Sequence, residues 1–209
     1  MARHRQASRR RRSPRRLRMG GYLIITDAAE TEKNYFCGLK ERIPQEYRED
    51  LQMKIFAGQK LEEIIDFAEE QREKDPRFRD VWLVFDRDAV PSFHELIHRA
   101  EGHGMKAGWS NPCFEIWLSA YFGSMKKAES SQQCCSQFAR LFSDCAHREY
   151  KKSDPDLYST LCRRGDEGQA VQLAQKRYQT KCRDSDNPED MTACTTVYQL
   201  VDEILTKIR

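Results

Sequence analysis

The chain has 209 residues, of which 39% are apolar and 33% are charged, a balance typical of a water-soluble protein with a core of its own. No apolar run approaches the roughly 18 to 20 residues that a membrane-spanning helix needs, and the N-terminus lacks the apolar segment of a secretory signal. We therefore expect a cytoplasmic protein without membrane contact, in which the eight cysteines are reduced thiols.

The net charge of +3 conceals an asymmetry along the chain. Residues 1–18 contain nine arginines and no acidic residue, whereas the remainder carries a net charge of −6. We expect residues 1–19 to be a disordered, Arg-rich arm, because like charges repel and little apolar surface is available for burial. A nucleic-acid backbone is the favoured partner, and a solubilising tail or a contact with an acidic protein is the alternative. The expected nucleic-acid contacts are Arg9, Arg10, Arg11, Arg12, Arg15 and Arg16.

Apolar runs and helical patterns alternate between residues 20 and 124. The patterns predict strands at 21–28, 51–57, 81–85 and 105–110, and helices at 30–43, 60–74, 91–104 and 113–123. This alternation indicates βαβ units, so residues 20–124 are predicted to form an α/β core with a mostly parallel, four-stranded sheet flanked by helices.

Beyond residue 124 the strand patterns stop, and the remaining periodic segments are typical of helices. We expect residues 125–209 to form a helical extension packed on the core. This extension could serve as a surface between two copies of the chain or as a lid over a site, and the sequence favours neither. The expected helices cover 131–149, 156–164, 167–181 and 192–208.

Acidic residues follow two of the predicted strands. Asp27 follows the first, and Asp86 and Asp88 follow the third, whose apolar run "VWLVF" is typical of a buried strand. Ligands of open parallel sheets bind at the carboxyl ends of the strands, so these carboxylates are expected to face one another across neighbouring strands. In an extended segment Asp86 and Asp88 would point the same way. Carboxylates in such proximity repel unless a cation neutralises them, which predicts a Mg²⁺ or Mn²⁺ site.

Simpler roles exist for each acidic residue. Asp27, Asp86 and Asp88 could merely solvate strand ends or cap helices, and we favour the metal site because Glu30 adds a further carboxylate near Asp27. Glu115 follows the fourth strand, where it could complete the first turn of a helix capped by Asn111, or act beside the metal.

Two other groups of residues have chemical potential. Lys151 and Lys152, with Tyr158 nearby, could hold a phosphate or form a solvated loop. A second group could bind zinc, although its spacing is unusual for such a site and small buried side chains are the favoured interpretation: Cys134, Cys135, Cys145 and His147.

The chain resembles the RloB-like family, whose genes are found beside restriction and abortive-infection loci in bacteria. The resemblance extends from residue 21 nearly to the end, and "SNPCFEIWLSAYF" (110–122) is its most specific part. The other segments that carry it are "LIITDAAETEKNYFCGL" (23–39), "VFDRD" (84–88), "KKSDPDLY" (151–158) and "TTVYQLVDEI" (195–204).

The resemblance implies a Toprim-like fold, a small Rossmann-like sheet whose acidic residues hold Mg²⁺ for phosphodiester chemistry. It implies a nuclease acting on RNA or DNA in phage defence, with an AAA- or ABC-type ATPase encoded nearby. The resemblance implies that Asp27, Asp86 and Asp88 ligate the metal. Together with Glu30 and Glu115, which the sequence places near them, these are the expected catalytic residues.

One departure leaves a second function open. RloB-like proteins typically carry Glu-Gly where this chain has Asp27–Ala28. An aspartate reaches one methylene less far, so either Glu30 or Glu32 compensates, or the site is degenerate. In the second case the protein would be a nucleic-acid-binding or regulatory subunit of a defence complex.

Overall fold

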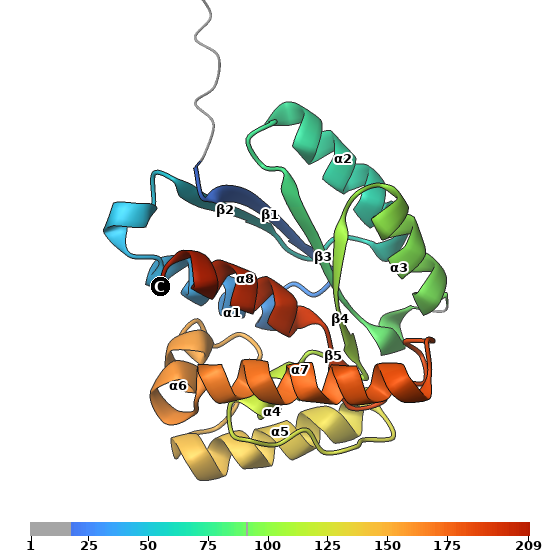
Figure 1. The fold of residues 1–209 in the computed structure, drawn as a ribbon. Helices are drawn as coiled ribbons and strands as arrows, with labels where there is room; N and C mark the ends of the chain where they lie inside the picture. Colours follow the sequence, from blue (N-terminus) through green and yellow to red (C-terminus); the bar gives the residue numbers. More distant parts are fainter. Residues whose placement is uncertain (1–17, 91) are drawn as a thin grey trace, which may run out of the picture.

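A computed structural model describes residues 18–90 and 92–209, which form an α/β structure around one twisted sheet (Figure 1). The arginines expected to bind nucleic acid, Arg9 to Arg16, lie outside the described residues, as does Pro91, which was expected near the start of the third helix. In the described chain the sheet has five strands in the order β2-β1-β3-β4-β5. The strands are β1 (Gly20–Thr26), β2 (Leu51–Phe56), β3 (Asp80–Asp86), β4 (Lys106–Asn111) and β5 (Cys194–Thr195).

The first four strands are parallel, as predicted, and the neighbouring positions of β1 and β3 are confirmed. The expectation of four strands is wrong, because β5 pairs antiparallel with β4. It falls in a segment predicted to be helical. Threonine hydroxyls reinforce the pairing: Ser110 Oγ and Thr195 Oγ1 are 3.0 Å apart, and Thr196 Oγ1 accepts from the Trp109 N–H at 2.9 Å.

Helices cover both faces of the sheet (Figure 1). Tyr22 and Ile24 of β1 point into a hydrophobic cluster shared with α1 and α8, whereas Leu23 and Ile25 point into a second cluster shared with α2 and α3. Successive side chains of a strand point to opposite faces, and both faces of this sheet are covered by helices. Both sets of side chains in β1 are therefore buried, which explains its uninterrupted apolar run. These helices are α1 (Thr31–Arg42), α2 (Ile64–Lys74), α3 (Phe93–Gly102) and α8 (Val197–Lys207).

The remaining helices pack beside the sheet as a second helical group. Side chains of this group extend the α1 and α8 cluster, with Phe138 and Phe142 of α5 fully buried. Two of these helices begin at side-chain caps, where Ser130 accepts from the Gln133 N–H and Asp166 from the Gln169 N–H. The helices are α4 (Glu115–Ala120), α5 (Ser131–Ala146), α6 (Leu157–Arg164) and α7 (Glu167–Asp184).

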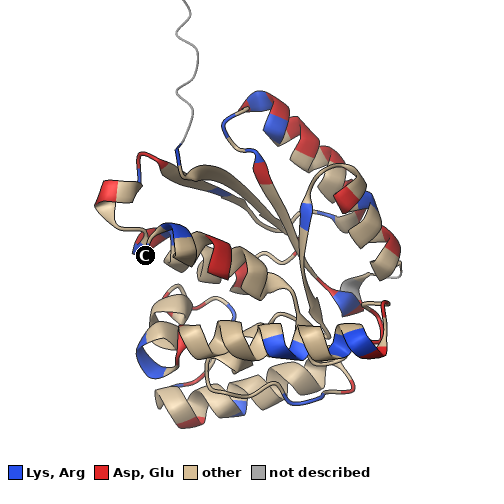
Figure 2. Ribbon diagram, in the orientation of Figure 1, with Lys and Arg blue, Asp and Glu red and all other residues tan. Residues whose placement is uncertain are grey.

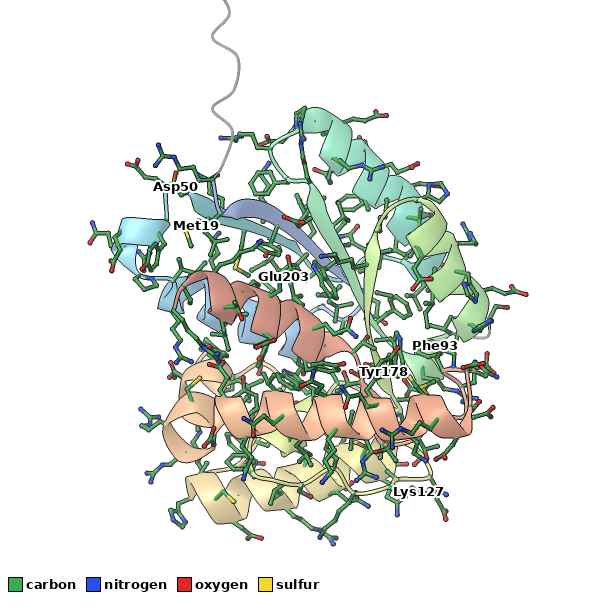
Figure 3. The ribbon with its side chains drawn as sticks, viewed as in Figure 1. Met19, Asp50, Phe93, Lys127, Tyr178 and Glu203 are labelled. Carbon is green, nitrogen blue, oxygen red and sulfur yellow. The ribbon has the colours of Figure 1, made fainter. Side chains whose placement is uncertain are left out.

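Figure 3 labels two aromatic side chains near the carboxyl end of β4, Phe93 of α3 and Tyr178 of α7. Trp109 of β4 contacts both, with ring centroids 5.7 Å from Phe93 and 6.1 Å from Tyr178. This chain of rings connects the sheet to the second helical group. It therefore fixes the strand end that precedes Glu115.

Charged residues lie mainly in the helices and loops, and few lie in the strands (Figure 2). Among the described residues, no helix has both the length and the apolar content needed to span a membrane.

Candidate functional site

Three parallel strands end at the same edge of the sheet. Asp27 directly follows β1, Asp86 ends β3, and Asn111 ends β4. The Asp27 N–H donates to the Val84 carbonyl of the neighbouring strand at 3.2 Å, which continues the sheet pairing one residue beyond β1. The turn that follows is fixed by Thr26, whose Oγ1 donates to the Ala28 carbonyl at 2.7 Å. The first and third strands therefore present adjacent carboxylates, as the sequence predicted.

Glu32, in the first turn of α1, is a deeply buried carboxylate beside these strand ends. It is 2% exposed, and its Oε2 atom has no hydrogen-bond partner among the described residues. Burial, followed by the charges of Asp27 and Glu115, raises the pKa of Glu32 to about 8. The sequence signalled this residue only as one of two glutamates that could compensate for the shorter Asp27.

Asp86 has a similar environment. Its Oδ1 atom is shielded from solvent and has no hydrogen-bond partner in the described part of the chain. Burial, followed by the charges of Glu32, Asp27 and Glu115, raises the pKa of Asp86 well above its usual range. The pKa of Asp27 rises to about 6, mainly through burial, although its Oδ1 accepts from the Ala28 N–H at 2.8 Å. The four carboxylates therefore act on one another electrostatically.

The structure corrects the expected geometry at two residues. The chain turns into a 3₁₀ helix at Arg87–Ala89, so Asp86 and Asp88 do not lie on one extended segment. Asp88 is exposed, but its charge still contributes to the raised pKa of Asp27. Glu30 is also exposed, immediately before α1, and the buried carboxylate of this turn is Glu32 instead.

Glu115 is held by a loop from the second helical group. It is 2% exposed, and its Oε1 accepts from the Tyr150 hydroxyl at 3.0 Å and lies 3.5 Å from Lys152 Nζ. The Tyr150 hydroxyl is also 3.3 Å from Thr31 Oγ1. The loop that contains Tyr150 thus connects Glu115 to the start of α1. A glutamate that only completed the first turn of its own helix would not need this contact. The sequence analysis gave Tyr150 no role. Its position directly before Lys151 and Lys152 was the signal that could have pointed to it.

The expected phosphate-binding residues separate into three environments. Lys152 lies beside Glu115 and its side chain is 58% exposed. Lys151 is exposed and pairs with the exposed Glu149 at 3.7 Å. Tyr158 is buried and donates to Glu167 Oε1 at 2.8 Å, so it cannot hold a phosphate at the surface.

Asn111 does not cap the following helix, contrary to one interpretation of the sequence. Its Nδ2 donates to the carbonyls of Pro188 and Glu189, each at 3.1 Å. Asn111 therefore ties the end of β4 to the loop that leads to β5. Phe114, Trp117 and Leu118 of the following segment are fully buried and serve as core residues.

We define Asp27, Glu32, Asp86 and Glu115 as the acidic cluster. Its donor set consists of carboxylate oxygens, two of them buried and unpartnered among the described residues, which suits a hard divalent cation such as Mg²⁺. Among the described residues, no three of these carboxylates bring oxygens within 4.8 Å of one another. Mg²⁺ commonly binds through one or two carboxylates and several waters, so the residues fit this ion despite their spacing.

The zinc site considered from the sequence does not form. Cys135 and Cys145 are ten positions apart on α5, which separates them by about 15 Å along the helix. His147 is exposed at the end of this helix. In the described chain, the group of three ligand atoms within 4.8 Å of one another comprises Cys113, Glu115 and Cys135 instead.

Comparison with known proteins gives one match. A family model described as RloB-like protein matches residues 22–204, which is most of the chain. No curated protein and no solved structure matches the chain.

Proposed function

The chain belongs to the RloB-like protein family, and from this premise we propose that it is a Mg²⁺-dependent, Toprim-type nuclease. The proposed reaction is hydrolysis of a phosphodiester bond in RNA or DNA. The proposed setting is bacterial phage defence, in which the chain acts with an AAA- or ABC-type ATPase.

The observation that carries the proposal is Glu32. A glutamate that is 2% exposed, with an unpartnered carboxylate oxygen in the described chain, is costly unless a proton or a cation neutralises it. Asp86 repeats the pattern beside it, and each charge raises the pKa of the other group. Two such carboxylates at the carboxyl edge of a parallel sheet are better explained by a bound cation than by stability alone.

The residues divide into two groups of roles. Asp27, Glu32 and Asp86 would hold the cation, and the exposed Asp88 would attract it. Bound Mg²⁺ polarises a phosphoryl oxygen and lowers the pKa of a water molecule. Lys152, half-exposed and oriented by Glu115, would contact the negatively charged phosphate.

Nucleic-acid capture would be shared with the N-terminal arm, whose nine arginines in residues 1–18 neutralise phosphates without reading sequence. The sequence contains no G-x-x-x-x-G-K-[ST] motif, so any use of ATP would come from the partner.

Cleavage assays test the proposal directly. Labelled RNA and DNA would be incubated with the protein and its ATPase in Mg²⁺, Mn²⁺ or chelator, and wild type compared with Asp86→Asn and Glu30→Gln. We expect metal-dependent cleavage of one nucleic acid, a loss of at least about 100-fold in Asp86→Asn, and full activity in Glu30→Gln. Cleavage that persists in chelator, or in a folded Asp86→Asn variant, would refute the metal-nuclease function.

A second function has a specific observation in its favour. The Asp27–Ala28 sequence and the spacing of the acidic cluster are also compatible with a metal-free, nucleic-acid-binding subunit of a defence complex. That function predicts nucleic-acid binding without stabilisation by millimolar Mg²⁺, and phage restriction in cells that survives the Asp86→Ala/Asp88→Ala double substitution.

A further inference from the structure

We propose that Cys113, Glu115 and Cys135 form a binding site for a thiophilic divalent cation, for which Zn²⁺ is the best fit. The three residues come from adjacent parts of the fold. Cys113 lies between β4 and α4, Glu115 opens α4, and Cys135 lies near the start of α5. Their ligand atoms all lie within 4.8 Å of one another.

The distance between the sulfur atoms fits a shared metal. Cys113 Sγ and Cys135 Sγ are 3.9 Å apart. Two sulfurs bound to one tetrahedral zinc, each at about 2.3 Å, are separated by about 3.8 Å. Both cysteines are free thiols, and the observed spacing is about twice the length of a disulfide bond. The sulfurs therefore already have the separation that zinc requires.

The surrounding backbone holds this arrangement in place. The Cys113 thiol is 3.8 Å from the Ser131 carbonyl, and Ser131 Oγ donates to the Pro112 carbonyl at 3.4 Å. These contacts connect the segment before α4 to the first turn of α5. Because both ligand-bearing segments are attached to each other and Cys113 is 3% exposed, little conformational freedom remains to be lost when a metal binds.

Charge and access also suit a cation. Binding would release the two thiol protons to solvent as two metal–sulfur bonds form. The negative charges of the two thiolates and the Glu115 carboxylate would then be balanced by the divalent cation and the Lys152 ammonium group. Lys152 Nζ is 3.5 Å from Glu115 Oε1. Cys135 is only partly buried, which gives the ion a path from solvent. Three protein ligands leave a fourth zinc position for water, as in catalytic zinc sites.

This site differs from the proposed Mg²⁺ site in its chemistry. Thiolates select zinc over magnesium, whereas the all-oxygen set of Asp27, Glu32 and Asp86 favours the harder ion. Glu115 adjoins both groups. A metal bound to the two cysteines would fix the position of Glu115 and, through it, that of Lys152.

Cobalt substitution provides the test. Reduced, metal-free protein would be titrated with Co²⁺ under anaerobic conditions, and the thiolate-to-cobalt charge-transfer absorption recorded. We expect one Co²⁺ per chain with thiolate absorption, displaced by one equivalent of Zn²⁺. Cys135→Ser should lose the absorption, whereas Cys145→Ser on the same helix should retain it.

Several outcomes would overturn the proposal, and the first needs no variant. Reduced wild type without thiolate absorption at excess Co²⁺ excludes the site. Thiolate absorption that survives in a Cys135→Ser variant with the circular dichroism spectrum of wild type excludes these ligands. If Cys113 and Cys135 are found in a disulfide, and reducing it restores no metal uptake, the site is excluded as well. Glu32→Gln separates this site from the proposed nuclease site, because it should keep the cobalt absorption while losing the response to Mg²⁺.

Discussion

Glu32 and Glu30 lie two positions apart and have opposite environments. Glu30 is exposed before the helix begins, whereas Glu32 is buried beside Asp27 and Asp86. The difference arises because the first turn of α1 directs one side chain beneath the strand ends. These two glutamates therefore form a natural pair in which the same substitution has different consequences.

Glu32→Gln should abolish most of the stabilisation by Mg²⁺, whereas Glu30→Gln should preserve it. At a Mg²⁺ concentration about 100 times the dissociation constant, wild type should gain about 2.7 kcal/mol. For a chain of this size that corresponds to a rise of roughly 5 to 10 °C in melting temperature. Differential scanning fluorimetry with and without Mg²⁺ measures the shift. Equal shifts in both variants would remove Glu32 from the metal site.

The pH dependence of stability gives a second prediction for the metal-free protein. The pKa of Glu32 rises from 4.5 to about 8 on folding, and that of Asp27 from 3.8 to about 6. The folded chain therefore binds more protons than the unfolded chain between these limits, so stability falls as pH rises from about 4 to about 8. The raised pKa of Asp86 acts in the same direction, and Glu32→Gln removes the contribution of Glu32.

Melting temperatures in chelator, measured at pH 5, 6, 7 and 8, would test this dependence. Glu32→Gln should become progressively more stable relative to wild type as the pH rises. A constant difference between the two proteins across this range would contradict the raised pKa of Glu32.

At the scale of elements, the contact between α1 and α6 depends on a glycine. A Cβ atom on Gly38 would lie 2.6 Å from the Tyr158 Cβ, closer than side chains can approach. Alanine at Gly102, the last residue of α3, would meet no atom within 4 Å. One glycine permits two helices to pack, and the other only lowers helix propensity.

Gly38→Ala should destabilise the chain by about 1 to 3 kcal/mol, because overpacking displaces α6 and outweighs the gain in helix propensity. Gly102→Ala should instead stabilise it, by up to about 1 kcal/mol. Urea denaturation measures both free energies of unfolding. Stabilisation by both substitutions would show that α6 moves aside without cost.

Sequence patterns predicted these elements where periodicity is strong. The four parallel strands and the βα alternation were recovered because β1 and β3 are nearly continuous apolar runs and β2 alternates between apolar and polar residues. Strand β5 was missed because two residues carry no measurable period, and because Thr195 and the following Thr196 pair with β4 through hydroxyl groups as well as through the backbone. Asn111 was interpreted as a helix cap, and Tyr150 was given no role. Their hydrogen-bond partners lie 77 and 35 positions away along the chain, respectively, so local sequence patterns could not reveal them.

At the scale of the whole molecule, the charge is divided between the arm and the acidic remainder of the chain. Removing residues 1–17 takes away eight arginines and leaves a chain of net negative charge. The hydrophobic clusters that hold the sheet are built from later residues, so the deletion should not change the melting temperature.

The deletion should weaken nucleic-acid binding and reduce its salt dependence, because each lost phosphate contact lowers the slope of log K against log salt by about 0.7 to 0.9. Fluorescence anisotropy at several salt concentrations measures this slope. A variant with the eight arginines replaced by lysine is the matched control and should keep the slope. An unchanged slope in the deletion variant would mean that the arm does not contact the phosphates.

The hydrogen bond from the Tyr22 hydroxyl to Glu203 Oε1 joins residues 181 positions apart, and Figure 3 shows Glu203 on α8 beside the sheet. On the ribosome, the face of β1 that carries Tyr22 and Ile24 is therefore only partly covered, by α1, until α8 has been synthesised. All four residues of the acidic cluster emerge much earlier, before the hydrophobic cluster that the sheet shares with α1 and α8 is complete. Completion of the fold must therefore follow translation of α8, so the acidic cluster reaches its final surroundings only after nearly the whole chain has been synthesised.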